Sequence, residues 1–220
     1  MFLHGYLATG NSFIHQIRYF SRFFDTFAPD LKGFGDNFEM PYPYALDDYI
    51  NDIKEYMYKN SIVRPSVIAH SFGGRIAIKC AAENERFFNK LVLTGAAGLK
   101  PKKTIKKTLK KATFNILKRF ISKEKLYMFY SDDYNALSPI MKESFKKIVS
   151  EYLDEQAKKI KNDTLIIFGE NDTETPIYMA KKLNKAIQNS KLKIFSGAGH
   201  FCFIDKPLTF NTEVMEFLLS

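Results

Sequence analysis

The sequence predicts an α/β fold with a mostly parallel sheet of about six strands and helices on both faces. Two observations carry this prediction. Short apolar runs alternate with helix-like segments along most of the chain, the pattern of a parallel sheet covered on both sides. Several of these runs end directly in glycines and polar residues. In an open parallel sheet those strand ends lie along one edge, so side chains far apart in sequence meet there.

Length and composition favour one domain. A chain of 220 residues with 45% hydrophobic content can build one substantial core but hardly two. We expect residues 1–98 and 162–220 to form this core and residues 99–161 to form an insertion. The two cysteines, Cys80 and Cys202, lie far apart in a chain without a secretory leader, so we expect a reduced compartment and a cytoplasmic protein.

The first elements are a short apolar strand and a flexible loop. Met1 to Leu3 form the run, and residues 4–11 contain the loop with its glycines. Apolar residues then recur at helical spacing from Ser12 to Phe24, and Phe24 to Phe27 are expected to form an edge strand. Residues 30–36 form a glycine-rich turn, but no Lys and Ser/Thr follow as a nucleotide-binding loop requires.

The segment from Val67 to Ala77 reads as strand, sharp turn and helix, with Ser71 in the turn. An amphipathic helix with aspartates near its start, Leu46 to Tyr58, precedes it. Such a turn lifts the serine hydroxyl above the sheet edge. It also aims the following N–H groups at the same space, where they can stabilise an oxyanion. Ser71 is our candidate nucleophile, and a plain turn is the alternative.

Three further strands are expected, and two of them end in candidate catalytic groups. Residues 90–95 form the first of these runs. Residues 164–168 lead into a loop that presents the acidic side chains Glu170, Asp172 and Glu174. Residues 192–195 lead into a loop that delivers His200, before a terminal helix.

Four motifs together resemble the alpha/beta-hydrolase superfamily over nearly the whole chain. The turn around Ser71 resembles its G-x-S-x-G nucleophile elbow, with Ala69 in place of the first glycine. The His4-Gly5 loop and the Asp-x-x-Gly-x-Gly turn at residues 30–36 resemble two more of its loops. The Gly-Glu-Asn-Asp-x-x-x-Pro run at residues 169–176 and the loop with His200 complete the set, in the family's order of nucleophile, acid and base.

The resemblance implies a serine hydrolase with the catalytic triad Ser71, Asp172 and His200. Asp172 is preferred over its acidic neighbours because it occupies the motif position. The N–H groups of Tyr6 and Phe72 would form the oxyanion hole. The remaining histidines are expected to be structural, and we expect neither a cofactor nor a metal.

The insertion at residues 99–161 contains no strand-like run and corresponds to the family's helical lid. Its basic helix between residues 105 and 121 has one apolar face, and the apolar cluster that follows supplies our candidate substrate contacts, Tyr127, Met128, Phe129 and Tyr130. Residues 100–125 hold 11 Lys and Arg against Glu124, while the rest of the chain holds 22 basic and 23 acidic residues. This charge is either a solvated face or a surface that attracts anionic membranes or acidic substrates, and no pattern favours nucleic acid.

The substrate is expected to be a small, largely apolar molecule with an ester-type acyl bond. Carbon–carbon bond hydrolysis, acyl transfer and non-catalytic ligand binding remain alternatives on the same fold. The family's first two strands are absent from this sequence, so the edge strand is expected to be exposed or covered by a second copy in a homodimer.

Overall fold

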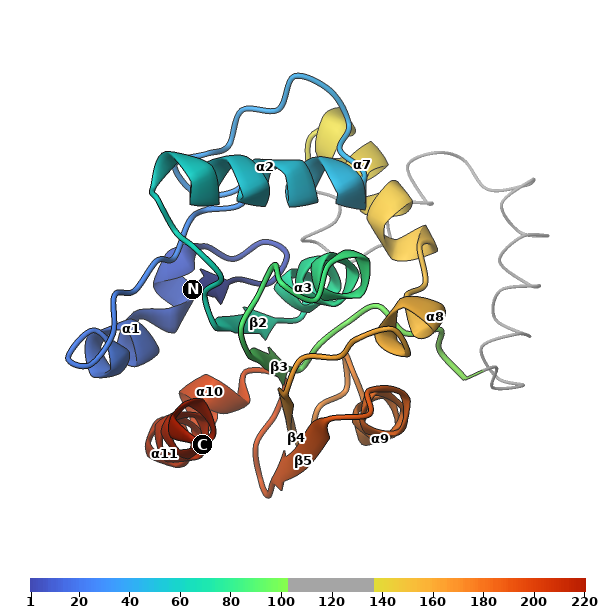
Figure 1. The fold of residues 1–220 in the computed structure, drawn as a ribbon. Helices are drawn as coiled ribbons and strands as arrows, with labels where there is room; N and C mark the ends of the chain where they lie inside the picture. Colours follow the sequence, from blue (N-terminus) through green and yellow to red (C-terminus); the bar gives the residue numbers. More distant parts are fainter. Residues whose placement is uncertain (103–136) are drawn as a thin grey trace.

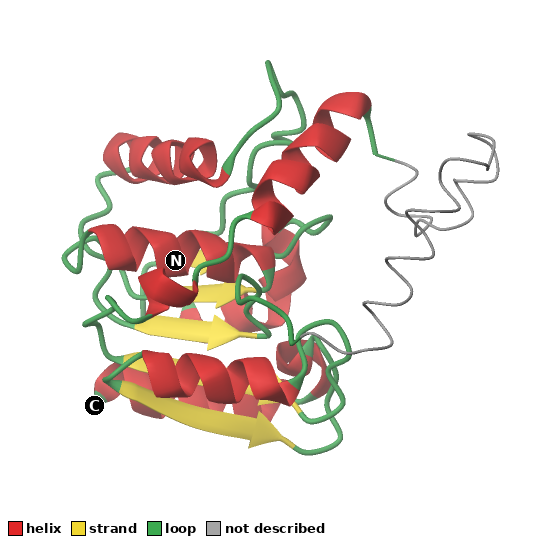
Figure 2. Cartoon of the chain, turned by 90° about the vertical axis from the view of Figure 1, so that its right-hand side faces the viewer, coloured by secondary structure: helices red, strands yellow, loops and turns green. Residues whose placement is uncertain are grey.

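The computed structural model describes residues 1–102 and 137–220 and confirms the α/β fold (Figure 1). Within these residues, five parallel strands form one sheet in the order β1-β2-β3-β4-β5. Figure 2 shows the strand arrows pointing toward one edge of the sheet, where loops gather. The strands are β1 (Phe2–Leu3), β2 (Val67–His70), β3 (Leu91–Thr94), β4 (Thr164–Gly169) and β5 (Ser190–Phe195).

Helices cover both faces of the sheet. They are η1 (Gly10–Phe13), α1 (Ile14–Phe20), α2 (Leu46–Lys59), α3 (Phe72–Glu83), α7 (Pro139–Ser150), α8 (Asp154–Ala157), α9 (Ile177–Ala186), α10 (Cys202–Asp205) and α11 (Pro207–Leu219). Successive strand residues point to opposite faces. Ile166 and Phe168 therefore join the core beneath α2, α3 and α9, whereas Leu165 and Ile167 join the core beneath α1 and α11.

The edge strand expected at Phe24 to Phe27 is wrong, so the described sheet has five strands rather than six. Residues 21–24 form a turn after α1, and residues 25–30 carry no strand. One hydrogen bond reaches the sheet, from Phe2 N to Phe27 O at 2.7 Å. Pro29 follows without an N–H to continue a ladder, and Phe23 and Phe24 remain exposed, so the run lacks the pairing of a strand.

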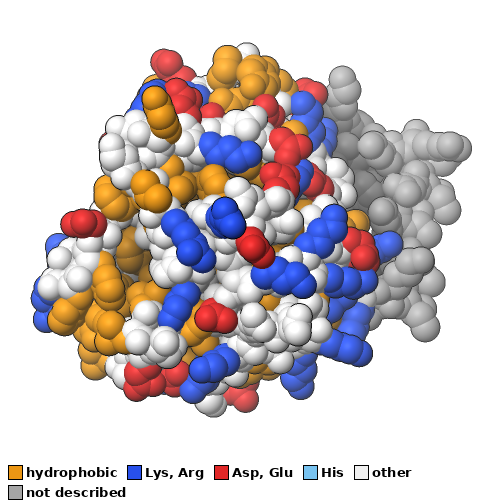
Figure 3. Space-filling model, viewed as in Figure 1, with side chains coloured by type: hydrophobic (Ala, Val, Ile, Leu, Met, Phe, Trp, Pro, Cys, Tyr) orange, Lys and Arg blue, Asp and Glu red, His pale blue; other side chains and the backbone are white. Residues whose placement is uncertain are grey.

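Apolar side chains gather beside this edge of the sheet. Figure 3 shows them on the side of the surface where α1 lies. A pocket of about 290 Å³ lies there, lined by side chains of β1, α1 and the segment that follows α1, including Phe2, Phe20 and Phe24. The homodimer through this edge stays a prediction.

Helix α7 is held in place by polar contacts along its middle and at its C-terminal end. Tyr44 N donates to Ser144 Oγ at 2.8 Å, and Lys147 Nζ donates to Pro43 O at 2.8 Å. From α3, Arg75 Nη1 donates to Ile148 O at 2.9 Å and to Glu151 O at 2.8 Å. The part of the expected lid that the structure describes, residues 137–161, thus contains α7 and α8 and is bound to the segment before α2 and to α3. The basic helix and the cluster of Tyr127, Met128, Phe129 and Tyr130 lie outside the described residues.

None of the helices in the described ranges combines the length and the apolar character needed to cross a membrane. The placement of the protein in the cytoplasm and the contact with anionic surfaces remain expectations from the sequence.

The turn between β2 and α3 packs so closely that two of its positions have no room for a side chain. A Cβ on Gly73 would lie 2.2 Å from Leu3 O, and a Cβ on Gly74 would lie 2.6 Å from Ala96 Cβ. Gly73 N also donates to His4 O at 3.0 Å. The start of α3 therefore sits directly on the backbone at the end of β1.

Substituting Gly73 tests this close approach. Because the new methyl group would meet a backbone carbonyl that has no freedom to rotate away, Gly73→Ala should lower the free energy of unfolding by about 2 kcal/mol or more. Gly199→Ala is the matched control, since its Cβ would meet only Asp205 Oδ2, at 3.6 Å. Urea unfolding followed by circular dichroism measures both, and equal stabilities of the two variants would contradict the packing described here.

Candidate active site

Ser71 occupies the sharp turn that the sequence predicts. Its backbone has φ 48° and ψ −105°, a conformation that L-residues rarely adopt and that costs about 1–3 kcal/mol. The surrounding backbone holds it in place: Ser71 N donates to Thr94 O at 3.2 Å, and Ser71 O accepts from Ala97 N at 3.0 Å. A strained residue fixed between two strand ends is typical of a functional position.

Asp172 and His200, which are 28 residues apart, meet at the same edge of the sheet. His200 Nδ1 lies 2.8 Å from Asp172 Oδ2, and the Asp172 side chain is fully buried. Because an ionised carboxylate only accepts, Nδ1 carries the hydrogen and Nε2 is left with a lone pair. This is the tautomer that a general base requires.

The loop after β4 supports the Asp172 carboxylate with further donors. The N–H groups of Glu174 and Thr175 reach Oδ1 at 2.9 and 2.8 Å, and the Thr175 hydroxyl lies 2.8 Å from Oδ2. Burial alone would raise the pKa of Asp172, but the hydrogen bonds from His200 and Thr175 outweigh it and hold this pKa below its ordinary value. Asp172 is therefore a carboxylate at neutral pH.

The two competing acids of this loop play other parts. Glu170 Oε2 accepts from Ser196 Oγ at 2.7 Å and from Gly197 N at 3.1 Å, which ties the acid loop to the loop that carries His200. Glu174 contributes its backbone N–H to Asp172. Asp172 is thus the acid that the structure places against His200.

Ser71 and His200 lie on adjoining loops. The ring of His70, the residue before Ser71, is 4.6 Å from the His200 ring, measured between centroids. In the described part of the chain, the hydrogen bonds of the His200 ring go to Asp172 and Thr175, and none joins it to Ser71 Oγ. Catalytic hydrogen bonds of this kind are often long without substrate and tighten in the substrate complex.

The loop after β1 approaches the serine from the other side. A Cβ on Gly5 would lie 3.5 Å from Ser71 Cβ, so the backbone leading to Tyr6 runs beside the candidate nucleophile. His4 orients this loop, since its Nδ1 lies 2.8 Å from Gly5 O and its Nε2 accepts from Leu31 N at 2.9 Å. His4 is therefore a positioning side chain, as expected.

The side chains of both candidate oxyanion donors are locked by aromatic packing. The Tyr6 ring meets the Phe72 ring at 5.5 Å and the Phe34 ring at 4.8 Å, edge to face in each case. Tyr6 Oη donates to Met141 O of α7 at 3.1 Å. The Tyr6 and Phe72 rings thus pack against each other beside Ser71, and α7 contacts the Tyr6 side chain.

His70 is a buried residue whose contacts sequence analysis did not anticipate. Its Nε2 lies 3.2 Å from His200 O, so Nε2 carries the hydrogen, and Nδ1 makes no hydrogen bond to any described residue. Burial, followed by the charge of His200, lowers the pKa of His70 to about 3. His70 is therefore a neutral ring between Gly5 and His200.

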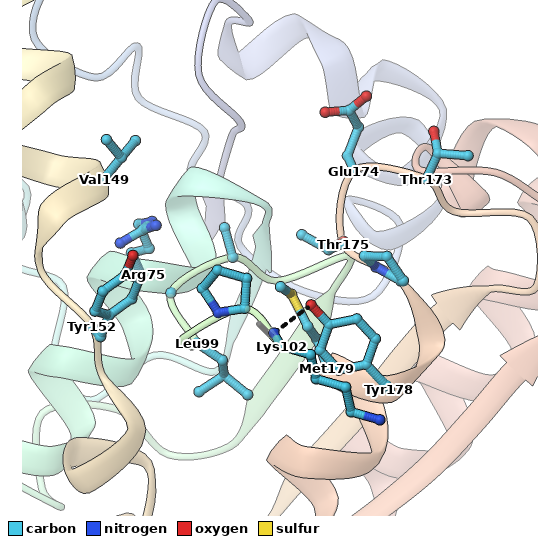
Figure 4. Close-up of a pocket in the computed structure, with 14 residues that line it drawn as sticks. Arg75, Leu99, Lys102, Val149, Tyr152, Thr173, Glu174, Thr175, Tyr178 and Met179 are labelled. Atoms are coloured by element: carbon cyan, nitrogen blue, oxygen red, sulfur yellow. Dashed lines mark hydrogen bonds between the residues drawn. The ribbon is translucent and has the colours of Figure 1, made fainter. Parts of the chain in front are cut away.

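A pocket of about 480 Å³ borders this site, within the size range of small-molecule sites (Figure 4). Its lining includes Arg75, Leu99, Tyr152, Thr175, Tyr178 and Met179. Sequence analysis missed these residues because they come from four separate segments. The one available signal was a charged Arg75 in an otherwise apolar stretch of α3.

Comparison with known proteins agrees with this architecture. A family model described as the alpha/beta hydrolase fold matches residues 1–129 and 117–207. The AB hydrolase superfamily protein YisY of Bacillus subtilis (strain 168) is 27% identical and covers 99% of this chain and 90% of its own.

Two solved structures are similar over their length. The meta-cleavage product hydrolase CumD of Pseudomonas fluorescens IP01 is 25% identical, with a TM-score of 0.74 and coverage of 99% of this chain and 89% of that one. The esterase EaEST of Exiguobacterium antarcticum is 24% identical, with a TM-score of 0.78 and coverage of 100% and 91%. The similarity to the esterase EaEST, at 24% identity, shows the fold alone.

His70 should make the protein sensitive to acid. Its pKa is about 3 in the folded chain against an ordinary 6.5, so the unfolded chain binds this proton first as the pH falls. Above about pH 6.5 the neutral His70 leaves the free energy of unfolding at its full value. As the pH falls from there toward 3, this free energy decreases by up to about 1.4 kcal/mol per pH unit. His70→Gln should remove this part of the pH dependence.

Urea unfolding between pH 7.5 and pH 4.5 measures this effect. His15→Gln is the control, because His15 is exposed on α1. If His70→Gln and the native chain lose the same free energy of unfolding over this range, the buried neutral state of His70 is contradicted.

Proposed function

Because the chain belongs to the alpha/beta hydrolase fold family, we propose that it is a serine hydrolase that cleaves an ester-type acyl bond through Ser71, His200 and Asp172. The family and its neighbours support a hydrolase. The observation that carries the finer proposal is the hydrogen bond of 2.8 Å between His200 and a buried, ionised Asp172, at the edge of the sheet where Ser71 stands.

The first step follows from what an unactivated serine lacks. A hydroxyl is a poor nucleophile until a base takes its proton, and His200 Nε2 has the lone pair for this transfer. As the proton moves, Ser71 Oγ attacks the ester carbonyl and the ring of His200 becomes positive. The ionised Asp172 stabilises that imidazolium and holds its orientation.

The attack places a negative charge on the carbonyl oxygen. The N–H groups of Tyr6 and Phe72 would donate hydrogen bonds to this oxyanion. One such donor typically increases kcat by a factor of about 10²–10³. His200 then returns its proton to the leaving alcohol, which leaves an acyl group on Ser71. A water molecule activated by the same base releases the acid and restores Ser71.

We also propose that residues 99–161 form a lid over this site. The support is that α7, at the end of this segment, binds Tyr6 through Met141 O and binds α3 through Arg75. The described part of the proposed lid is thereby attached to the loop after β1 and to helix α3, which begins directly after Ser71.

Hydrolysis of a carbon–carbon bond is the second candidate function. The observation in its favour is the similarity to the meta-cleavage product hydrolase, which extends over nearly the whole chain. The same serine, histidine and aspartate would serve it, so assaying an ester and a meta-cleavage product side by side decides between the two.

Replacing the nucleophile tests the proposal. The native chain should react covalently with a fluorophosphonate probe at Ser71 and hydrolyse short-chain nitrophenyl esters, whereas Ser71→Ala should do neither. Ser190→Ala is the control, because Ser190 is the first residue of β5 and lies at the amino-terminal ends of the strands, whereas Ser71 lies at their carboxyl ends. Labelling of another residue, or ester turnover by Ser71→Ala, would overturn the assignment of Ser71.

Replacing the acid tests the role of the carboxylate. Asp172→Asn keeps the shape of the side chain but favours the wrong His200 tautomer, so kcat should fall by about 10⁴-fold. Asp163→Asn, the same change at the exposed aspartate directly before β4, is the matched control and should stay near the native value. An Asp172→Asn variant with nearly native kcat would show that another group orients His200.

A further inference from the structure

We infer that the pocket beside the active site binds a carboxylate of the substrate, and that Arg75 is the residue that selects it. This inference rests on the proposed function and specifies its substrate class: an ester whose acyl part carries a second, ionised carboxyl group.

Arg75 is buried, with 8% of its surface exposed, yet no carboxylate of the described residues pairs with it directly. Its hydrogen bonds to described residues come from Nη1 alone and reach two backbone carbonyls, of Ile148 and Glu151. The Glu151 carboxylate pairs instead with Lys79, at 2.6 Å. Within the described part of the chain, the guanidinium is therefore a buried positive charge without a direct anionic partner.

The remaining donors of Arg75, on Nε and Nη2, have no hydrogen bond to the described residues, and neither atom is fully enclosed. The side chain lines the pocket together with Val149 and Tyr152, which flank it in Figure 4. A desolvated charge with unused donors is unfavourable unless an anion completes it. The planar fork of a guanidinium matches the two oxygens of a carboxylate.

The pocket adjoins the segments that carry Ser71 and His200. Arg75 follows Ser71 by four residues along α3, a rise of about 6 Å. Two other lining residues contact Ser71 and His200: Ala97 N donates to the backbone oxygen of Ser71 at 3.0 Å, and the Thr175 hydroxyl lies 3.3 Å from His200 Nδ1. We therefore place the acyl chain of the proposed acyl-enzyme in this adjoining pocket.

The other lining residues indicate what kind of group connects the ester carbonyl of the substrate to its second carboxylate. Leu99, Val149 and Met179 provide apolar walls for a short run of methylene groups. Lys102 adds a second positive charge to the lining, and Glu174 adds a negative one that points away from Arg75 in Figure 4. The lining keeps a net positive charge, which favours an anionic substrate.

Matched esters test the inference in the full chain. The probes are the mono-4-nitrophenyl ester of glutaric acid and its methyl-capped, uncharged counterpart. The native chain should hydrolyse the charged ester with a kcat/KM at least about tenfold higher, because a charged hydrogen-bonded pair outweighs its neutral counterpart. Arg75→Met should reverse this preference.

Glu151→Gln separates charge recognition from the attachment of α7. It removes the ion pair between Lys79 of α3 and Glu151, but it frees no carboxylate and leaves the charge of Arg75 in the pocket, so the tenfold preference should persist. If the native chain hydrolyses both esters equally well, or if Glu151→Gln loses the preference as Arg75→Met does, the inference is overturned.

A binding measurement makes the test independent of turnover. Calorimetric titration of Ser71→Ala with the two esters should show about tenfold tighter binding of the charged ester. If Arg75→Met fails to fold, Arg75→Lys takes its place and should weaken the binding of the charged ester. If the native chain fails to react with the fluorophosphonate while this difference persists, the proposed function fails and the anion pocket stands. Equal binding of the two esters would reject the pocket itself.

Discussion

The active-site geometry depends on one steric constraint, which is the close packing of the β2–α3 turn against the ends of β1 and β3. Gly73 rests on the Leu3 carbonyl and Gly74 on Ala96, so α3 begins immediately after the strand and Ser71 takes the strained conformation between them. The conformational cost is offset by the cores that hold the strands and α3 in place. Without this packing, Ser71 would be an ordinary turn serine.

Hydrogen-bond donors at the same edge of the sheet stabilise the buried carboxylate of Asp172. A buried carboxylate is costly unless donors surround it, and Asp172 receives donors from its own loop and from His200. These contacts fix the tautomer of His200, while His70 contacts the backbone of His200 on one side and Gly5 on the other. The loops that would supply acid, base and oxyanion donors are thereby positioned relative to one another by short-range contacts.

Arg75 connects this site to the segment above it. Its Nη1 binds the carbonyls of Ile148 in α7 and of Glu151 directly after it, and its stem lies against the turn at Gly98, where a Cβ would approach Arg75 Cγ to 3.3 Å. The residue therefore joins α3, the turn after β3 and the segment that contains α7. A single side chain can combine this structural role with recognition, because a guanidinium carries more donors than the two carbonyls use.

Local sequence patterns predicted the strands that end in the candidate catalytic groups, since apolar runs followed by glycine and polar residues are visible within a few positions. The preference for Asp172 over Glu170 and Glu174 came from motif position, and the structure places Asp172 against His200. The strand expected at Phe24 to Phe27 was wrong, because closely spaced aromatic residues resemble a strand in sequence while strand pairing depends on neighbouring segments, and Pro29, two residues later, has no N–H to continue a ladder. The pocket around Arg75 is assembled from distant segments, and no local pattern records such an arrangement.

The most direct test of this account is a crystal structure of the protein after reaction with a fluorophosphonate. The account predicts phosphorus bonded to Ser71 Oγ, with one phosphoryl oxygen within hydrogen-bond distance of the Tyr6 and Phe72 N–H groups and with His200 still bound to Asp172. A phosphoryl oxygen directed away from both N–H groups, or a His200 ring turned away from Ser71, would contradict it.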